Sequence, residues 1–298
     1  MSCRCRCALA AALCAAGAWA HAAEPVTAPV TIYAAGDIAR CQHPDARFAG
    51  ASDTAAIVAG GLAADPGAVV LTLGDSTYPV GAASEFANCY EPTWGRFKER
   101  TWPAPGNHEY YTPKAAPYFA YFGARAGKGY YSFELGSWHV VSLNSNLGPL
   151  EHAAQLAWLR EDLELHPARC TLAYWHHPLF SSGWHGSIPT MRAAWDLLYR
   201  FGAEIVLSGH DHVYERFAPQ DAKGSFDGEQ GIRQFVVGTG GAFPTPFKWA
   251  IANSEVRDAT GFGVLRLTLL DDGYEWQYVP AGQRPAGAQP DHGKASCH

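Results

Sequence analysis

The sequence predicts an α/β protein in which layers of strands and helices share a core. From Val30 onwards, short apolar runs alternate with amphipathic stretches, a pattern typical of layered strands and helices. A chain of 298 residues, of which 48% are hydrophobic and 17% charged, is long enough to bury a large core. No linker rich in Pro, Gly or Ser interrupts residues 30–279, so we expect a single domain over residues 30–280.

The predicted elements follow one another in a regular order. Residues 30–37 and 68–75 are apolar runs that end in Gly-Asp, which predicts two buried strands leading into loops. Between them, Asp53 is the expected N-cap of a helix that ends at Ala64. Residues 77–128 are dense in Pro, Tyr and Trp, and we expect a long non-helical segment that lines a site. The later elements are a hairpin (129–146), a helix (151–165), a strand (170–175), a helix (190–201), two strands (204–209 and 232–241) and a strand pair (261–279).

The two ends of the chain differ from the domain between them. Arg4 and Arg6 precede an apolar run that closes in small residues, which predicts a signal peptide over residues 1–20 and a secreted or periplasmic protein. The alternative is a retained membrane anchor, although the run is shorter than the roughly 20 residues that span a bilayer. A short N-terminal lead, 21–29, follows. The tail, 281–298, is rich in Gly, Pro and Ala, and we expect it to be flexible apart from Cys297.

Four cysteines remain once the predicted signal peptide is set aside. An even number in an exported protein predicts disulfides, and we expect Cys41 to pair with Cys89 and Cys170 with Cys297. Four free thiols are the alternative. The net charge of −6 gives no reason to expect a nucleic acid or an anionic membrane as partner, because both favour basic surfaces.

Side chains of the kind that bind metals follow several predicted strands. At five places an apolar stretch is followed by such residues: Asp37, Asp75, Asn107 with His108, His176, and His210. Each of these residues alone has a purely structural explanation. Gly-Asp after a strand is most often a turn, and a single histidine is usually a polar residue with hydrogen-bond partners and not a metal ligand. Together they favour one site, because ligands of α/β proteins gather beyond the carboxyl ends of the strands.

The donor types indicate the chemistry of this site. Carboxylate, amide and imidazole groups form a mixed set that suits Zn²⁺, Mn²⁺ or iron. Two metals about 3.5–4 Å apart are the usual apparatus for hydrolysing phosphoric esters. Such a pair needs a bridging carboxylate, and Asp75 is the natural candidate.

The ordered series "GDIA", "GDSTY", "GNHE", "HHP" and "GHDH" resembles the calcineurin-like metallophosphoesterase superfamily, specifically its purple acid phosphatase branch in a compact, single-domain bacterial-type form. Many relatives carry Asp-x-His in the first motif, whereas here Ile38 and Ala39 follow Asp37. Purple acid phosphatases also lack that histidine and carry a tyrosine three residues after the second aspartate, as Tyr78 does after Asp75. The resemblance implies a four-layer α/β/β/α sandwich of two mostly mixed β-sheets flanked by helices.

The resemblance also implies two sets of metal ligands that share Asp75. The first set is Asp37, Asp75, Tyr78 and His212, and the second is Asp75, Asn107, His176 and His210. The first metal would be Fe(III), with tyrosinate-to-iron charge transfer, and the second Zn, Mn or Fe(II). Of the adjacent histidines, the family pattern points to His176 rather than His177 as the ligand.

Two further histidines are candidates for catalysis. A metal-bound hydroxide would attack the phosphorus, and His108 matches the family residue that assists the leaving group. His185 resembles a second histidine that faces the substrate, and the alternative is an ordinary loop residue. Glu109 is expected to orient His108.

The leading functional hypothesis is an exported acid phosphatase that hydrolyses phosphate monoesters of small molecules. The alternatives are a phosphodiesterase on the same two metals and, with intact ligand motifs against it, a non-catalytic cell-surface binding module. The glycines of "VVGTGGAF" are taken as structural, because prolines follow where a nucleotide-binding helix would begin. His139, His152 and His166 are expected to be surface or packing residues without partners.

Overall fold

The computed structural model describes residues 28–40, 50–282 and 289–298. The predicted signal peptide and Cys41 lie outside these residues, so the signal and the Cys41–Cys89 pairing stay predictions. Among the helices described, none has the length and apolar character required to cross a membrane.

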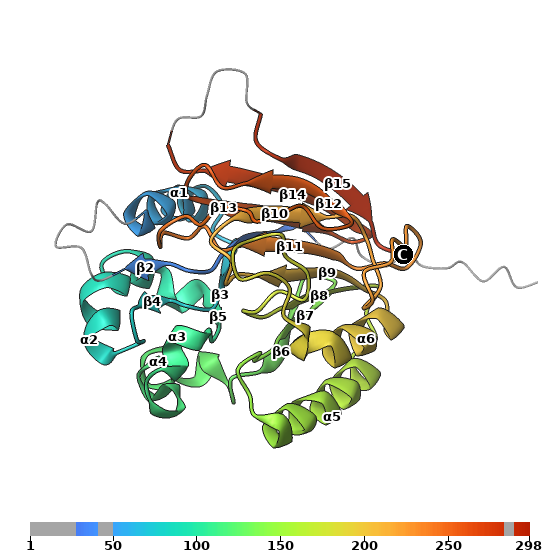
Figure 1. Cartoon of the computed structure of the whole chain (residues 1–298), viewed down its shortest axis with the longest axis horizontal. Helices are drawn as coiled ribbons and strands as arrows, with labels where there is room; N and C mark the ends of the chain where they lie inside the picture. The colour runs from blue at the N-terminus through green and yellow to red at the C-terminus, as the bar shows by residue number, and fades with distance from the viewer. Residues whose placement is uncertain (1–27, 41–49, 283–288) are drawn as a thin grey trace, which may run out of the picture.

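Two β-sheets stack face to face at the centre of the molecule (Figure 1). The six-stranded sheet has the order β15 (His292–Ser296), β14 (Gly273–Pro280), β13 (Gly263–Leu270), β1 (Val30–Ala35), β3 (Val69–Leu73) and β5 (Thr101–Ala104). The seven-stranded sheet has the order β12 (Ser254–Asp258), β10 (Tyr214–Phe217), β11 (Arg233–Val237), β9 (Ala203–Ser208), β8 (Cys170–Tyr174), β7 (Trp138–Ser142) and β6 (Tyr131–Leu135). A short parallel pair, β2 (Ala39–Arg40) with β4 (Thr77–Tyr78), lies beside them. Both large sheets are mixed, since β1, β3 and β5 pair in parallel, as do β7, β8, β9 and β11, and the outer strands are antiparallel.

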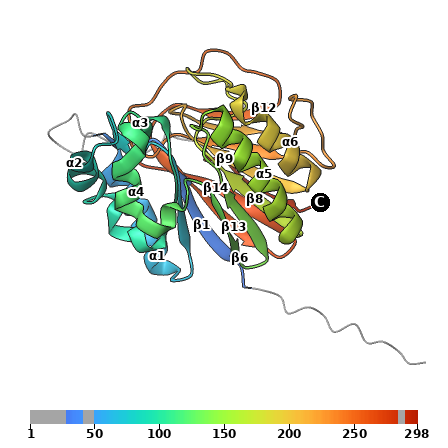
Figure 2. The same ribbon diagram turned by 90° about the horizontal axis from the view of Figure 1, so that it is seen from below.

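Helices cover the outer faces of both sheets. Figure 2 shows α1 to α4 on one side of the sheets and α5 and α6 on the other. Their bounds are α1 (Ala51–Ala64), α2 (Ala83–Glu85), α3 (Asn107–Tyr110), α4 (Ala116–Phe122), α5 (Pro149–Leu165) and α6 (Arg192–Arg200). Short segments of π- or 3₁₀-helix are η2 (Phe86–Tyr90), η3 (Trp94–Arg100), η4 (Pro113–Ala115), η5 (Gly123–Ala126) and η6 (Pro189–Met191). The expected four-layer α/β/β/α sandwich is therefore confirmed.

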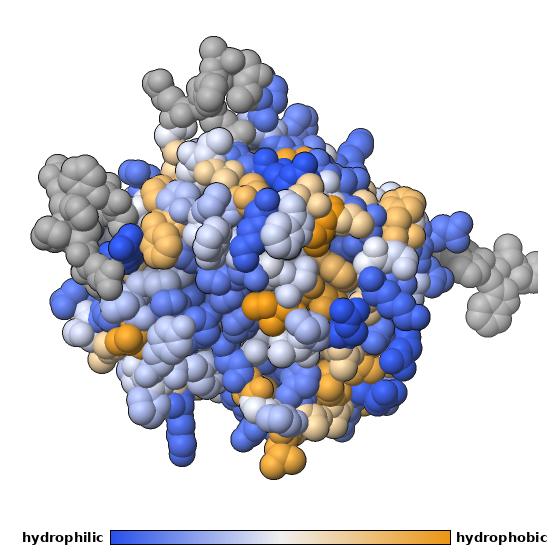
Figure 3. Space-filling model, in the orientation of Figure 1, coloured by the Kyte–Doolittle hydropathy of each residue, from blue (hydrophilic) through white to orange (hydrophobic). Residues whose placement is uncertain are grey.

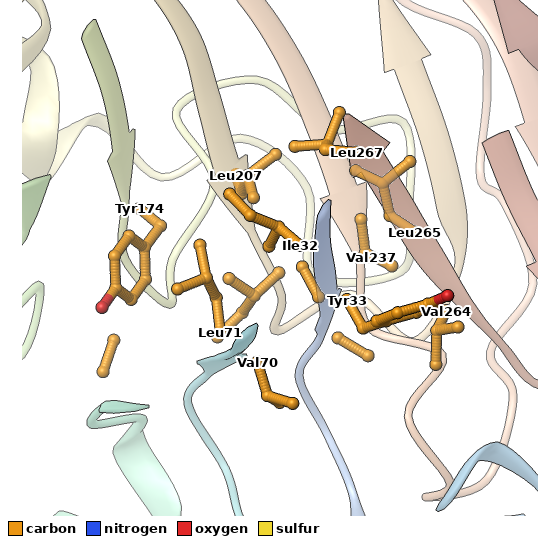
Figure 4. Packing of buried hydrophobic residues seen from close by; sticks show 14 of the residues in the cluster. Ile32, Tyr33, Val70, Leu71, Tyr174, Leu207, Val237, Val264, Leu265 and Leu267 are labelled. Carbon is orange, nitrogen blue, oxygen red and sulfur yellow. The ribbon is translucent and has the colours of Figure 1, made fainter. Parts of the chain in front are cut away.

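The core fills two of the spaces between these layers. Between the sheets, Ile32 and Leu71 of one sheet face Leu207 of the other (Figure 4), and all three side chains are fully buried. Val206, the neighbour of Leu207 in β9, packs on the opposite face with α5 and α6, because side chains alternate along a strand. A strand buried on both faces reads as a continuous apolar run, which is why the sequence predicted β9. Outside this core, hydrophilic side chains dominate the face drawn in Figure 3.

Three expectations about the elements are wrong. Gly50, not Asp53, is the N-cap of α1, and Asp53 lies in the first turn, where its charge favours the helix dipole. The segment 77–128 is not free of helix, because it contains the short helices α2 to α4 and the segments η2 to η5. The tail is not simply flexible: β15 pairs antiparallel with β14, from Gly273–Ser296 to Gln277–His292.

The predicted bridge between Cys170 and Cys297 is present and explains part of the order of the tail. It joins the first residue of β8 in one sheet to the residue that follows β15 in the other. The last residue is also held, since the His298 backbone N–H donates to Glu204 Oε1 at 2.8 Å.

Candidate metal centre

The first group of predicted ligands comes together around the hydroxyl of Tyr78. Tyr78 Oη lies 2.7 Å from Asp37 Oδ1 and 3.0 Å from Asp75 Oδ2. It also lies 3.1 Å from Nε2 of His212, which is 3.2 Å from Asp37 Oδ1. All four side chains are buried. Asp37 follows β1, Asp75 follows β3 and Tyr78 ends β4, so the six-stranded sheet and the short pair position three of them.

The second group of predicted ligands lies around the amide oxygen of Asn107. Asn107 Oδ1 is 3.0 Å from His176 Nε2 and 3.1 Å from His210 Nδ1, and these two nitrogens are 3.2 Å apart. His176 Nε2 is also 3.3 Å from Asp75 Oδ2. The same oxygen of Asp75 therefore belongs to both groups. His176 follows β8 and His210 follows β9, so the seven-stranded sheet contributes to this group.

Carboxylate and amide oxygens, imidazole nitrogens and the Tyr78 hydroxyl face one another here, a set of ligand atoms that fits a cation. His176 Nδ1 lies 2.8 Å from the Leu73 carbonyl oxygen and His212 Nδ1 lies 2.6 Å from that of Phe243. A carbonyl can only accept, so each Nδ1 carries a proton, and in the neutral ring each Nε2 presents a lone pair. These lone pairs point at carboxylate and amide oxygens, and a positive ion between them would satisfy all of them.

The protein environment by itself favours the neutral form of two of these groups. Burial raises the pKa of Tyr78 well above its ordinary value, and the charges of Asp37 and Asp75 raise it further. Burial lowers the pKa of His210, and the neighbouring His176 lowers it further, so His210 is kept in the neutral form that binds metals.

Glycine makes the close approach of these loops possible. A Cβ on Gly106 would lie 2.1 Å from Asp75 Oδ1, and a Cβ on Gly209 would lie 2.6 Å from Asp37 Oδ2. Asp37, Asp75 and His210 have left-handed backbone conformations, with φ of 60°, 50° and 70°. Such strained conformations cluster at functional sites, where the surrounding structure stabilises them.

Glu109 was expected to orient His108, but its hydrogen bonds go to the backbone of two loops. Its buried carboxylate accepts the backbone N–H groups of Asp75, Ser76 and Gly106 at 2.9, 2.7 and 2.7 Å. It therefore holds the loop after β3 against the loop after β5, instead of orienting His108. Burial raises the pKa of Glu109 to about 8, and the nearby Asp75 contributes to the rise.

His108 is oriented by the backbone. Its Nδ1 lies 2.5 Å from the Pro79 carbonyl oxygen, and its Nε2 lies 3.8 Å from Asp75 Oδ2. Its own backbone N–H donates to Asp75 Oδ1 at 2.8 Å. The side chain is 24% exposed, which leaves Nε2 close to the site and open to a ligand.

His185 also lies at the site. Its ring centroid is 4.4 Å from that of His210. The buried carboxylate of Asp211 holds its loop by accepting the His185 N–H at 2.7 Å, the Gly186 N–H at 3.1 Å and the Ser181 hydroxyl at 2.5 Å. Sequence reasoning missed Asp211, although its place between two predicted ligands in "GHDH" was a signal.

His177 was also missed as a neighbour of the site. Its ring centroid is 4.4 Å from that of His210, and its Nδ1 lies 2.8 Å from the Ser145 hydroxyl. Burial and the adjacent His176 lower the pKa of His177 to about 3.

The expectation that His139 and His166 lack partners is wrong. His139 Nδ1 lies 2.7 Å from Glu134 Oε1, and His139 Nε2 lies 2.9 Å from Asp162 Oδ2. His166 Nδ1 is 3.4 Å from Asp162 Oδ1. This separate cluster connects the hairpin β6–β7 to α5.

Comparisons with known proteins identify a family and several relatives of the chain. Residues 30–214 match the family of calcineurin-like phosphoesterases. Purple acid phosphatase 15 of Arabidopsis thaliana is 31% identical over 188 residues, which is 50% of this chain and 35% of that protein. Purple acid phosphatase 1 of Ipomoea batatas is 31% identical over 176 residues, 50% of this chain and 37% of that protein. The match thus spans little more than a third of the length of these relatives.

Solved structures share the fold at low sequence identity. Purple acid phosphatase PPD1 from yellow lupin has a TM-score of 0.69 at 18% identity and covers 91% of this chain and 54% of its own. GAP50, the anchor in the inner membrane complex of Plasmodium, has a TM-score of 0.68 at 12% identity and covers 91% of this chain and 89% of its own. The matched residues contain all the motifs from "GDIA" to "GHDH", and the chain belongs to the calcineurin-like phosphoesterase family.

Proposed function

We propose that this chain is an exported acid phosphatase that hydrolyses phosphate monoesters with two metal ions. The observation that carries the proposal is the position of Asp75 Oδ2, which lies in contact with both groups of predicted ligands. Two ions joined by a carboxylate are the usual apparatus for this reaction, and when bound they supply an activated water and offset the charge of the phosphate. The proposed ligands are Asp37, Asp75, Tyr78 and His212 for one ion and Asp75, Asn107, His176 and His210 for the other.

The identity of the ions is part of the proposal. A buried phenol with a raised pKa loses its proton most readily to a highly charged ion, so Tyr78 favours Fe(III) in the first position. The second position, with one carboxylate, one amide and two imidazoles, suits Zn, Mn or Fe(II).

His108 would protonate the leaving group. Its Nδ1–H is committed to the Pro79 carbonyl, so Nε2 is the nitrogen that can deliver a proton to the departing oxygen. His185 and His177 lie against His210, where they would contact the phosphate oxygens.

Export is supported by the sequence of the first 20 residues and by the Cys170–Cys297 bridge, since disulfides persist in oxidising compartments.

Metal analysis combined with hydrolysis tests the proposal. The purified protein should contain two metal ions per chain and hydrolyse p-nitrophenyl phosphate faster than bis(p-nitrophenyl) phosphate. His210→Ala should lose the second ion and His212→Ala the first, which element analysis of each variant would detect. Faster cleavage of the diester would favour the phosphodiesterase alternative, and a wild-type protein with less than one ion per chain and no hydrolysis would contradict the enzymatic hypothesis.

The role of Tyr78 has its own spectroscopic test. Iron-loaded protein should show a visible absorption band, and Tyr78→Phe should remove or shift it because the phenolate is its source. Tyr111→Phe, which changes an exposed tyrosine beside the same site, is the matched control and should keep the band. An unchanged band in Tyr78→Phe would show that Tyr78 is not a ligand.

A further inference from the structure

Exposed aromatic side chains gather beside the candidate metal centre. Within the described part of the chain, the large aromatic side chains that are highly exposed to solvent are Tyr111, Trp184, Phe226, Phe243 and Trp249. Single exposed apolar side chains are ordinary on a protein surface, whereas a group of them at one place indicates a binding function. Phe243 and Tyr111 contact predicted ligands directly, and Trp184 precedes His185, whose ring lies against that of His210.

Phe243 lies directly against one predicted ligand. Its ring centroid is 4.8 Å from that of His212, and its carbonyl oxygen accepts from His212 Nδ1. The ring is 46% exposed, so one part of it contacts the ligand and another part faces solvent.

Trp184 is adjacent in sequence to a residue beside the second predicted ion position, and Trp249 is connected to Trp184 through Lys248. Trp184 directly precedes His185, whose ring contacts His210. Lys248 connects the two tryptophans, since its Nζ lies 5.1 Å from the ring centroid of Trp184 and 5.9 Å from that of Trp249. The Lys248 backbone N–H also donates to the Ser182 carbonyl at 3.0 Å, which ties the segment 243–251 to the loop that carries His185.

Two cations accompany these rings. The Arg40 guanidinium carbon lies 4.8 Å from the ring centroid of Phe243, and Lys248 lies over the tryptophans. In a chain with a net charge of −6, positive groups at this position complement an anionic ester.

We propose that Trp184, Phe243 and Trp249, which we call the aromatic rim, bind a planar aromatic group on the alcohol part of the substrate. The inference rests on the proposed function and names its substrate class: phosphate monoesters whose alcohol carries an aromatic ring or a nucleobase. The rings offer faces for stacking and exposed area for burial, while Arg40 and Lys248 attract the ester. Tyr111 is left out of the rim because its hydroxyl accepts from Asn107 Nδ2, a predicted ligand.

A matched pair of substrates isolates the contribution of the ring. Adenosine 5′-monophosphate and ribose 5-phosphate release the phosphate from the same primary alcohol of the same sugar, and they differ by the base. The ratio of their kcat/KM values should favour the nucleotide by about tenfold, the size of effect that base stacking on an aromatic side chain produces. Trp184→Ala and Trp249→Ala should each lower this ratio, and Trp184→Phe should restore most of it.

Phe226→Ala is the matched control. Phe226 is 66% exposed, but it lies in the loop that joins the end of β10 to the start of β11, at the opposite end of both strands from His212 and Gly238. The ratio should be the same in this variant as in the wild type. A wild-type ratio near one, or a ratio that neither tryptophan substitution changes, would overturn the aromatic rim while leaving the phosphatase hypothesis intact.

Binding of adenosine gives a readout that does not depend on catalysis. Adenosine has no phosphate to lose, and stacking on the rim should quench the tryptophan fluorescence of metal-loaded protein in a saturable way, whereas ribose should not. Affinity should fall about tenfold in Trp184→Ala. If the wild type hydrolyses neither ester, the proposed function fails, and saturable adenosine binding still decides whether the rim exists.

Discussion

Asp211 illustrates how a residue that binds no ion can determine the shape of this site. It stands between His210 and His212, yet its carboxylate turns away from them and accepts two backbone N–H groups and a hydroxyl from residues 181–186. A Cβ on Gly183 would lie 2.4 Å from its carboxyl carbon, so the loop passes very close to it. The position of His185 over His210 therefore depends on Asp211.

Replacing Asp211 should weaken catalysis without removing the ions. The Asp211→Asn substitution keeps the size of the side chain but removes its negative charge. A hydrogen bond to a charged group contributes about 1.5–3 kcal/mol, so the hydrogen bonds that position the loop should become weaker. We expect kcat/KM for p-nitrophenyl phosphate to fall about tenfold or more, with two ions still bound in element analysis.

Asp221→Asn is the control for this change. Its carboxylate also accepts two backbone N–H groups, from Lys223 and Ser225 at 2.8 Å each, but in the loop between β10 and β11. Equal losses of activity in both variants would contradict a positioning role of Asp211.

The candidate ligands could be selected from the sequence because they stand in short motifs beside predicted strands. The sequence did not show how they are supported, because the supports come from distant parts of the chain. Glu109 binds the loop of Asp75, and the Pro79 carbonyl orients His108; neither contact follows from local spacing. Residue types were predictable here, whereas their hydrogen-bond partners required the fold.

At the scale of elements, a charged cluster connects the hairpin β6–β7 to helix α5. His139 on β7 lies between Glu134 on β6 and Asp162 on α5. Burial alone would lower the pKa of His139, but its hydrogen bonds to Asp162 and Glu134 outweigh burial and raise it. The pKa of Asp162 is lowered, since the hydrogen bonds to His139 and Ser132 outweigh its burial.

These shifts predict how stability depends on pH. Because the pKa of His139 is raised in the folded protein, its protonation stabilises the fold. This contribution is complete below pH 6.5, the ordinary pKa of histidine, and is lost as the pH rises through the pKa of His139 in the folded protein. The lowered pKa of Asp162 stabilises above its ordinary value of 3.8 and is lost as pH falls. His139→Gln should therefore lower the free energy of unfolding by about 3 kcal/mol at pH 5, the cost of breaking a buried ion pair, and by clearly less at pH 9.

Urea unfolding at the two pH values checks this prediction, and His152→Gln in α5, the helix that carries Asp162, is the control. Burial lowers the pKa of His152, so its replacement should have the opposite pH trend. The same loss at pH 5 and pH 9 in His139→Gln would show that the charge of His139 does not stabilise the hairpin.

The elements that the sequence missed are short or polar. β12 and β15 alternate between half-buried and exposed residues and contain few apolar side chains, so no hydrophobic pattern marks them. The helices α2 to α4 have between three and seven residues, too few for a helical period to be recognised. The long buried strands were predictable from their runs of apolar residues, and α6 was predictable from its amphipathic period.

At the scale of the whole molecule, the two sheets are joined by the Cys170–Cys297 bridge at one end and by the candidate metal centre at the carboxyl ends of their strands. The bridge closes a loop with a sequence separation of 127 residues. Such a loop is long, so most of the stabilisation is expected from restricting the unfolded chain.

Removal of this bridge should destabilise the fold. In the double variant with Cys170→Ser and Cys297→Ser, the free energy of unfolding should fall by about 2–5 kcal/mol in urea under oxidising conditions. In reducing buffer the difference from the wild type should shrink to the small cost of burying two hydroxyl groups. A difference of the same size in both buffers would show that side-chain packing, and not the bridge, is responsible.

The strand order of the six-stranded sheet has a consequence for synthesis. The first strand, β1, lies between β3 and β13, and Val30 pairs with Leu269. A ribosome must therefore synthesise β13, up to Leu269, before β1 can meet its second neighbour, and until then one edge of β1 is open to pairing with other strands. A chain that terminates before Gly263 would keep that edge open permanently, so truncated products should aggregate where the full chain folds.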